Sequence, residues 1–573
     1  MHYLALACDY DGTIARDGRV ADQTIAALER LRASGRKLIL VTGRELDDLL
    51  AIFPRVDLFE WVVAENGCLL YQSATQEIHA TCPAPAEVFI AALRARAVEP
   101  LSVGKVIVAT HVPHETTVIE VIRELGLELQ VIFNKGAVMI VPAGKNKATG
   151  LTAALEKLGL SAHNVVGIGD AENDHAFLAL CACGVAVANA LPMLKEHADF
   201  VTTGEAGAGV VELIDELMEN DLAGREPLLV RHHLLLGTRE DDTEMRVAPH
   251  GVNILLAGPS GAGKSTITSG IVERLAQQHY QFCIIDPEGD YQDLEGTVAL
   301  GAADRVPTIE EVMRLMQKPD TNAAVNLVGI PFNDRPAFFM SLLSRISELR
   351  AKTGRPHVVI VDEAHHVLPA SWQPSNLALP QKIKGVLYIT LEPASLMPAV
   401  ISSIDMLIAI GETPERTVEE FAGATALALP PLPENTPLER GELLVWEIGA
   451  EHRPFKIRGI PGRAQRRRHL RKYSEGDLGP DRSFYFRGRE GKLNLKAQNL
   501  IVFMQLADGI DDQTWIYHLR HGDYSHWFSA CIKDEMLARE AKIIENNEHL
   551  SPAESRRLIK DAITKRFTLP ARA

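Results

Sequence analysis

The stretch that decides the fold of the middle of this 573-residue chain is Gly258-Pro-Ser-Gly-Ala-Gly-Lys264-Ser265-Thr266. It follows an apolar run, Val252–Ala257, and precedes a segment of helical character, Ile267–Leu275. In this order of strand, glycine-rich loop and helix, the loop can surround a phosphate with its backbone N–H groups. Lys264 would reach the β- and γ-phosphates, and Ser265 would offer its hydroxyl to Mg²⁺. The residues that we expect to bind ATP and its metal are Gly258, Ser260, Gly261, Gly263, Lys264, Ser265, Thr266 and Asp362.

Two later apolar runs carry residues suited to ATP hydrolysis. Val358–Val361 has the β-branched composition of a buried parallel strand and leads to Asp362 and Glu363. Asp362 can position Mg²⁺ through water, and Glu363 can polarise an attacking water, which favours hydrolysis over transfer to a second substrate. A strand over 385–389 ends at Thr390, where a sensor of the γ-phosphate can lie.

A different chemistry is indicated at the start of the chain. The short apolar run Tyr3–Cys8 ends in Asp9-Tyr-Asp11-Gly-Thr13. Carboxylates two residues apart at a strand exit point the same way, so Asp9 can attack phosphorus while Asp11 protonates the leaving oxygen. Two more apolar runs, 37–41 and 165–168, end in Thr42-Gly-Arg44 and in the acidic loop Asp170-Ala-Glu-Asn-Asp174, which suit a phosphate and a hard cation. Parallel strands alternating with helices would gather these strand ends at one crevice.

In this order, with Lys145 and Lys147 ahead of the third run, the motifs resemble the haloacid dehalogenase superfamily of phosphatases, subclass IIB, over residues 1 to about 220. Glu65-Asn-Gly67 and the run 184–190 belong to the resemblance. It implies a Rossmann-like domain with Asp9 as nucleophile, Asp11 as acid and base, Thr42 holding the phosphate and Lys147 neutralising it, with Lys145 as a rival. The Mg²⁺ site that it implies is made of Asp9, Asp11, Asp170, Asn173 and Asp174.

An insertion over about 68–144 separates the second of these runs from the third. It contains strand-like runs at 105–110, 129–133 and 137–141 and helical pieces at 86–95 and 116–125. In the family that the sequence resembles, such an insertion is an α+β cap that closes over the substrate. A cap favours small phosphorylated metabolites over polymers, so it argues against nucleic-acid ends as substrates. We place the end of this phosphatase domain at residue 224.

The middle of the chain resembles the HerA/FtsK branch of P-loop ATPases over about 228–460. The resemblance rests on the turn Asp286-Pro-Glu-Gly-Asp-Tyr291, on Asp362-Glu-Ala-His365 and on the strand 405–411. It implies a RecA-like domain over 225–460 and a homo-oligomer, in that branch a hexamer that moves DNA or protein. Arg440 is our candidate for an arginine that reaches a neighbouring subunit's γ-phosphate, with a surface hairpin arginine as the alternative.

Two departures from that branch weaken the expectation of translocation. Leu391-Glu-Pro393 follows Thr390, where the branch often has a polar glutamine or histidine. The β-barrel that usually precedes the motor is missing, unless a hairpin over 228–246 is its remnant.

The last hundred residues divide into a basic linker, 461–482, and a small, mostly helical module, 483–573. The basic strip Arg463–Lys472 can contact a nucleic-acid backbone or remain a solvated linker. A polar–aromatic cluster in the module is more typical of a satisfied core than of a catalytic site; its members are Trp515, His518, Arg520, Asp523, Tyr524 and Trp527.

Composition sets the outer limits of these interpretations. The net charge of −16 argues against a uniformly basic nucleic-acid coat, and seven scattered cysteines indicate neither a disulfide framework nor a zinc site. The sequence lacks an apolar run of the ~18 residues that span a bilayer, and the run at its start has no basic leader. We therefore expect a cytoplasmic α/β multidomain protein without a membrane partner.

The combined interpretation is a bifunctional enzyme: a Mg²⁺-dependent phosphatase joined to a P-loop ATPase, acting in nucleic-acid processing or defence. Three alternatives stay open. The first is a sugar- or metabolite-phosphate phosphatase gated by an ATP-binding module, and the second is a kinase paired with a phosphatase. The third is a non-catalytic scaffold that uses the nucleotide as a switch.

Overall fold

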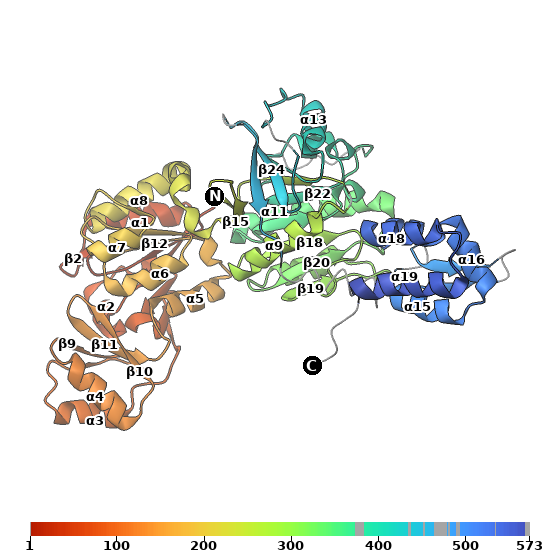
Figure 1. The fold of residues 1–573 in the computed structure, drawn as a ribbon. Coiled ribbons are helices and arrows are strands. Elements are labelled where there is room, and N and C mark those ends of the chain that lie inside the picture. The colour runs from red at the N-terminus through yellow and green to blue at the C-terminus, as the bar shows by residue number, and fades with distance from the viewer. Residues whose placement is uncertain are drawn as a thin grey trace.

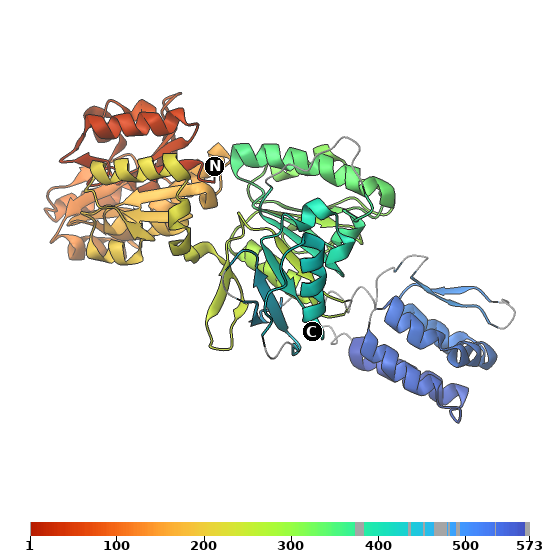
Figure 2. The ribbon, with the colours of Figure 1, turned by 90° about the horizontal axis from the view of Figure 1, so that it is seen from above.

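The computed structural model describes residues 2–259, 261–372, 383–433, 437–450, 453–462, 478, 482–488, 493–532 and 534–567. Along these residues the chain forms three bodies in a row: an α/β domain with its cap, a second α/β domain and a helical module (Figure 1). Figure 2 shows the same order from above. Among the described residues, none of the helices has the length and apolar character needed to cross a bilayer.

The first domain is built on an eight-stranded sheet in the order β14-β13-β12-β1-β4-β5-β6-β7. Neighbours from β14 to β5 are parallel, and β6 and β7 continue the sheet antiparallel. Helix α1 packs against α8 and helix α5 against α6, one pair on each side of the sheet (Figure 1). The strands are β1 (Ala5–Cys8), β4 (Lys37–Val41), β5 (Trp61–Ala64), β6 (Leu69–Gln72), β7 (Glu77–Ala80), β12 (Val165–Gly169), β13 (Cys183–Ala186) and β14 (Phe200–Val201), and the helices α1 (Asp22–Ala33), α2 (Leu46–Ile52), α5 (Lys147–Leu158), α6 (His175–Leu180), α7 (Pro192–His197) and α8 (Gly207–Asn220).

The cap is a separate small layer with its own apolar core. Its sheet has the order β10-β11-β9-β8, and its helices bury Phe89, Leu93, Val118 and Val121 against it. The insertion expected over 68–144 thus has two parts, because β6 and β7 extend the domain sheet and the cap sheet begins at β8. The cap elements are α3 (Glu87–Ala95), β8 (Ser102–Val103), β9 (Val108–His111), α4 (Glu115–Leu125), β10 (Leu129–Asn134) and β11 (Ala137–Pro142).

The second domain has an eleven-stranded sheet, β16-β15-β25-β24-β23-β17-β22-β21-β18-β20-β19. The strands from β23 to β19 are parallel, and both faces are covered: Leu255 of β17 lies in one apolar core and Leu256 in the other. Burial on both sides explains why these strands read as unbroken apolar runs. Its strands are β15 (Leu234–Thr238), β16 (Glu244–Val247), β17 (Ile254–Ala257), β18 (Phe282–Asp286), β19 (Thr297–Leu300), β20 (Asn322–Asn326), β21 (Val358–Val361), β22 (Val386–Thr390), β23 (Met406–Ala409), β24 (Glu442–Glu447) and β25 (Phe455–Gly459), and its longer helices α9 (Lys264–Gln277), α10 (Ile309–Met316), α11 (Arg335–Thr353) and α13 (Pro414–Thr425).

The hairpin predicted over 228–246 is formed by β15 and β16. It joins the edge of this large sheet through β25.

The C-terminal module packs helices around aromatic side chains beside the short hairpin β26 (Phe484–Phe486) and β27 (Leu495–Ala497). Trp515 and Tyr524 are fully buried and stack at a centroid distance of 4.5 Å. The polar–aromatic cluster singled out in the sequence is therefore largely the core of this module. Its helices are α15 (Leu500–Gly509), α16 (Asp512–His521), α17 (Asp523–Ala530), α18 (Glu535–Glu545) and α19 (Pro552–Phe567).

The two α/β domains contact each other at the amino-terminal ends of their strands. His163, just before β12, stacks on Tyr280, just before β18, with ring centroids 3.7 Å apart. The guanidinium of Arg355, which is 1% exposed, donates to the carbonyl oxygen of Gly159 at 2.6 Å. The carboxyl ends of the strands, where the predicted functional residues lie, are therefore the ends away from this contact.

Candidate functional site

The predicted residues of the first domain meet where three parallel strands end. Asp9 follows β1, Thr42 follows β4 and Asp170 follows β12, and β1 pairs with both of the other strands. All three residues are buried, at 4%, 1% and 0% exposure. As the alternating apolar runs predict, these parallel strands bring a carboxylate, a hydroxyl and an acidic loop together at one edge of the sheet.

Lys147, the first residue of α5, lies between two of the carboxylates. Its Nζ donates to Asp9 Oδ1 and to Asp174 Oδ1, both at 2.6 Å. Burial, together with the charge of Asp174, raises the pKa of Asp9 to about 8. Burial alone would lower the pKa of Lys147, but Asp174 and Asp9 hold it above its usual value, so the lysine remains a cation. Lys145 takes no part in these contacts.

The acidic cluster fits a hard divalent cation. Carboxylate oxygens of Asp9, Asp170 and Asp174 lie within 4.8 Å of one another. Among the described residues, Asp170 Oδ1 and Asn173 Oδ1 are buried side-chain oxygens without a hydrogen-bond partner. Because buried oxygens of this kind lose hydrogen-bond energy unless a ligand approaches, and because oxygen donors suit Mg²⁺, these residues would hold that ion.

The three aspartates have different surroundings. Asp174 Oδ2 accepts the backbone N–H groups of Asp170 and Ala171, at 2.8 and 2.9 Å, so Asp174 shapes the loop and orients Lys147. One carboxylate oxygen of Asp170, Oδ1, has no hydrogen-bond partner among the described residues, and Lys147 contacts Oδ1 of Asp9 rather than Oδ2. Asp170 and Asp9 are therefore the direct ligands that this geometry favours, with Asp174 and Asn173 in support.

Asp11 lies at the edge of the cluster and pairs with Arg44, for which the sequence predicts no specific role. Arg44 donates to both carboxylate oxygens of Asp11, at 2.6 and 2.8 Å. The carboxylate of Asp11 is therefore not among the three clustered groups of the predicted metal site. Asp11 comes two residues after Asp9, and its side chain is 42% exposed, so it is accessible to solvent.

Two cap residues that the sequence does not predict, Met139 and Lys135, contact residues of the candidate site. Met139 of β11 accepts a hydrogen bond from Asn66 Nδ2 through its sulfur at 3.2 Å. Lys135, in the turn between β10 and β11, forms an ion pair with Asp170. The Asn134-Lys-Gly136 sequence indicates a tight turn, but only the folded cap shows that its lysine reaches the catalytic loop.

In the second domain, the glycine loop lies between β17 and α9 as predicted. Lys264 Nζ donates to the carbonyl oxygens of Gly258 and Pro259, at 2.7 and 3.0 Å. Gly263 has φ +105° at the start of the helix, and a Cβ on Gly258 would lie 2.2 Å from the carbonyl oxygen of Ile410. The backbone needs glycine at both positions. Ser265 is exposed and Thr266 half-buried, whereas Ser260 lies outside the described residues.

The other predicted residues of this domain line up on adjacent strand ends. Asp362 and Glu363 follow β21, and Thr390 ends the neighbouring strand β22, which itself pairs with β17. Loss of solvation, followed by the charges of Glu363 and Asp286, raises the pKa of Asp362 to about 7. His365 connects the two ends, because its Nδ1 lies 3.3 Å from Thr390 Oγ1 and 3.6 Å from Glu363 Oε2.

Two further predicted contacts remain predictions. Arg440 is exposed in the turn before β24, where it is available to a neighbouring molecule. The basic strip Arg463–Lys472 lies outside the described residues.

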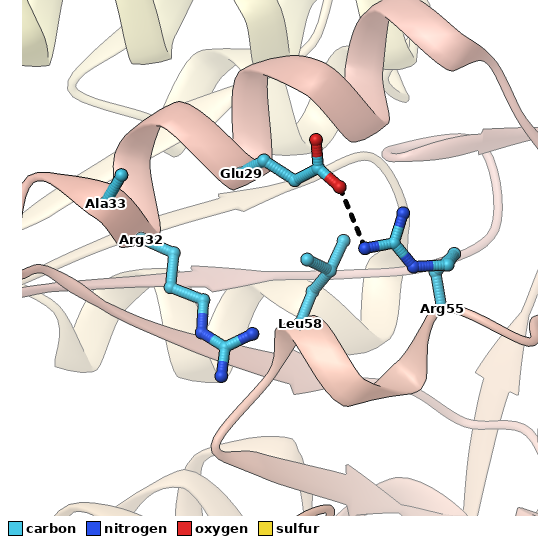
Figure 3. Close-up of a pocket in the computed structure, with 5 residues that line it drawn as sticks. All are labelled: Glu29, Arg32, Ala33, Arg55 and Leu58. Atoms are coloured by element: carbon cyan, nitrogen blue, oxygen red, sulfur yellow. Dashed lines mark hydrogen bonds and ion pairs between the residues drawn. The ribbon is translucent and has the colours of Figure 1, made fainter.

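A surface hollow of about 410 Å³ lies between α1 and the 3₁₀ turn η1 (Val56–Leu58). Figure 3 shows its lining residues, with Arg55 paired to Glu29 at 2.8 Å. None of the predicted site residues lines this hollow.

Comparison with known proteins finds matches for two separate parts of the chain. Residues 6–96 and 94–214 match the family model for haloacid dehalogenase-like hydrolases, and residues 253–384 match the model described as the central domain of helicase HerA. A phosphoglycolate phosphatase of Methanothermobacter thermautotrophicus is 32% identical over 222 residues, which cover 37% of this chain and 98% of that protein. Phosphoglycolate phosphatase 2 of Saccharolobus solfataricus is 27% identical over 232 residues, or 39% of this chain and 95% of that one.

A solved haloacid dehalogenase-like hydrolase from Bacteroides thetaiotaomicron is 20% identical, covers 38% of this chain and 99% of its own, and has a TM-score of 0.33. The matches to the phosphatases and to HerA fall on separate parts of the sequence, as the motifs do. Through its N-terminal domain the chain belongs to the haloacid dehalogenase-like hydrolases, Cof-like subclass IIB, and it carries a HerA-type P-loop domain behind it.

Proposed function

We propose that the first domain is a Mg²⁺-dependent phosphatase that acts through an aspartyl-phosphate on small phosphorylated metabolites. The observation that carries the proposal is the buried contact of Lys147 with Asp9 and Asp174, beside the unpartnered oxygens of Asp170 and Asn173. The positive charge of Lys147 opposes the rise that burial causes in the pKa of Asp9, and it would balance the charge of an incoming phosphoryl group.

Each residue would have a defined part in the two steps. A carboxylate oxygen of Asp9 would attack phosphorus, forming a new P–O bond while the bond to the substrate's ester oxygen breaks. Asp11 would donate a proton to that leaving oxygen, then accept one from the water that hydrolyses the aspartyl-phosphate. To do so, Asp11 must exchange its ion pair with Arg44 for the substrate. Bound Mg²⁺ would supply a fixed positive charge that draws the phosphoryl oxygens towards Asp9.

The cap would limit the size of the substrate. Lys135 and Met139 reach from the cap to the catalytic loops, which leaves little room for a duplex or a long strand. The relatives named phosphoglycolate phosphatase support the same substrate class, a small monoester. This proposal takes up the metabolite alternative in place of a nucleic-acid substrate.

For the second domain we propose ATP binding and hydrolysis. Glu363 follows β21, and the neighbouring strand β22 ends at Thr390. Glu363 would be the water-polarising carboxylate that a kinase does not need. A homo-oligomer with Arg440 contributing to the neighbouring site, and nucleic-acid contact through Arg463–Lys472, remain proposals that rest on the resemblance and on the sequence.

The test is phosphate release from a metabolite panel that includes phosphoglycolate, and from 5′- and 3′-phosphorylated DNA and RNA, each with and without ATP. We expect Mg²⁺-dependent turnover of small monoesters and none of nucleic-acid ends. Preferential release from nucleic-acid ends would overturn the substrate class, and no release from any monoester would overturn the phosphatase proposal.

A further inference from the structure

We propose that Lys135, at the tip of the cap hairpin, binds a second anionic group of the substrate, such as a carboxylate close to the phosphate ester. This inference rests on the proposed phosphatase function and narrows its substrate class to monoesters that carry a second negative charge.

The ammonium group of Lys135 lies beside the loops that carry the candidate catalytic residues, although the residue belongs to the cap. Lys135 Nζ pairs with Asp170, which is 0% exposed, while the lysine side chain itself is 44% exposed. A Cβ built on Gly12 would lie 2.9 Å from this Nζ. The ammonium group therefore lies directly over the loop that carries Asp9 and Asp11, where the leaving-group side of a bound ester must extend.

The backbone at Lys135 is held in a conformation that a lysine rarely adopts. Asn134 pairs with Ala137, so Lys135 and Gly136 form a two-residue turn, with φ +47° and +89°. Turns of this type favour asparagine or glycine at the first of the two positions, so a lysine there is strained. Such strain persists where the surroundings hold the backbone, and here the backbone N–H of Lys135 donates to Glu172 at 3.3 Å.

The charges explain why the lysine would turn to the substrate. Asp170 is the carboxylate that the geometry favours as a direct Mg²⁺ ligand, so an arriving divalent cation would compete with Lys135 for it. Repelled by that cation, the ammonium group would move to the nearest other anion. The phosphoryl group already has Lys147, and Glu172 already accepts the backbone N–H of Lys135, so the partner that we infer for its ammonium group is a negative charge on the leaving group.

The first experiment compares two substrates that differ in that charge: phosphoglycolate, with a carboxylate, and 2-hydroxyethyl phosphate, with a neutral end. The wild type should prefer phosphoglycolate, and Lys135→Met should lower kcat/KM for it by about 10- to 100-fold, as expected for loss of a charge-assisted hydrogen bond, while turnover of the neutral ester stays within a few-fold. Lys135→Arg should restore part of the preference. Arg123→Met is the matched control, because Arg123 is an exposed cation on the cap helix α4.

A second readout needs no turnover. In the presence of Mg²⁺, calorimetry would compare binding of 3-phosphonopropionate with that of propylphosphonate to the intact wild-type and Lys135→Met chains. We expect the carboxylate to tighten binding by about 10-fold or more only when Lys135 is present. Equal losses for both ligands, or a carboxylate preference that survives in Lys135→Met, would overturn the inference. If the wild type binds with this preference but turns over no monoester, the phosphatase proposal fails and the role of Lys135 in recognition stands.

Discussion

At the scale of single residues, Glu363 carries the proposal that the second domain hydrolyses ATP. Glu363→Gln keeps the shape of the side chain and removes the base, so we expect normal ATP binding with hydrolysis slowed by about 100-fold or more. Lys264→Ala should instead weaken binding itself, because it removes the cation that reaches the phosphates. Both effects are measured by nucleotide binding and by phosphate release.

The matched control for Glu363→Gln is Glu392→Gln, which changes an exposed glutamate two residues after Thr390. It should behave as the wild type. Normal hydrolysis by Glu363→Gln would remove the proposed base and favour the kinase alternative.

Much of the phosphatase site could be predicted residue by residue, because its members follow apolar strands in a fixed order. The sequence left Lys145 and Lys147 open as the neutralising cation, and of these two it is Lys147 that contacts Asp9 and Asp174. Lys135 was not predicted because its contact with Asp170 exists only when the cap is folded and closed. The pairing of Arg44 with Asp11 likewise depends on β4 lying beside β1.

At the scale of elements, the burial of a strand decides whether its sequence predicts it. Strands covered on both faces, such as β17 and β21, read as unbroken apolar runs and were located closely. The part of the insertion that belongs to the core, β6 and β7, was not separated from the cap. Strand β7 has one half-buried and three exposed residues, so its sequence carries no apolar run that would mark it as part of the domain sheet.

The junction between cap and core depends on Glu65, a buried carboxylate in the turn η2 (Glu65–Gly67). It accepts the backbone N–H groups of Lys105, Val106 and Ile107 at 3.1, 2.7 and 3.0 Å. Glu65→Ala should leave these amides without acceptors and loosen the cap by about 1–3 kcal/mol. We expect faster hydrogen exchange at residues 105–107 and a higher KM for small substrates.

Glu77→Ala, at an exposed position of β7 in the same domain, is the control for that change. Unchanged exchange at 105–107 in Glu65→Ala would show that other contacts hold the cap closed.

At the scale of the whole molecule, the two α/β domains contact each other at the ends of their strands that lie opposite the candidate sites. Histidines are concentrated there: His163 contacts the rings of His232 and His357 edge-on, and His2 stacks on His250 at 3.7 Å. Burial, with the charges of neighbouring histidines, lowers the pKa of His163 and of His2 to about 3. These rings are therefore neutral in the docked state.

Acid should weaken this contact. The pKa of these histidines in the docked state is below the ordinary value of 6.5, so the separated state binds more protons. The histidines therefore contribute their full stabilisation of the contact above pH 6.5. This contribution is lost as the pH falls from 6.5 towards 3. For His163 the loss is about 1.4 kcal/mol per pH unit in that range. We expect the radius of gyration from small-angle scattering to increase between pH 7.5 and 5, and less so in His163→Phe. A radius that stays constant over that range would contradict this expectation.

The aspartyl-phosphate that we propose at Asp9 is the intermediate on which the proposed function depends most directly, and it can be trapped. The intact chain would be mixed with Mg²⁺ and phosphoglycolate labelled in its phosphate, quenched in acid within one turnover and digested. We expect the label on the peptide that contains Asp9, and neither label nor more than about one thousandth of the wild-type turnover in Asp9→Asn. Turnover at the wild-type rate by Asp9→Asn, or label on a different residue, would contradict the proposed mechanism.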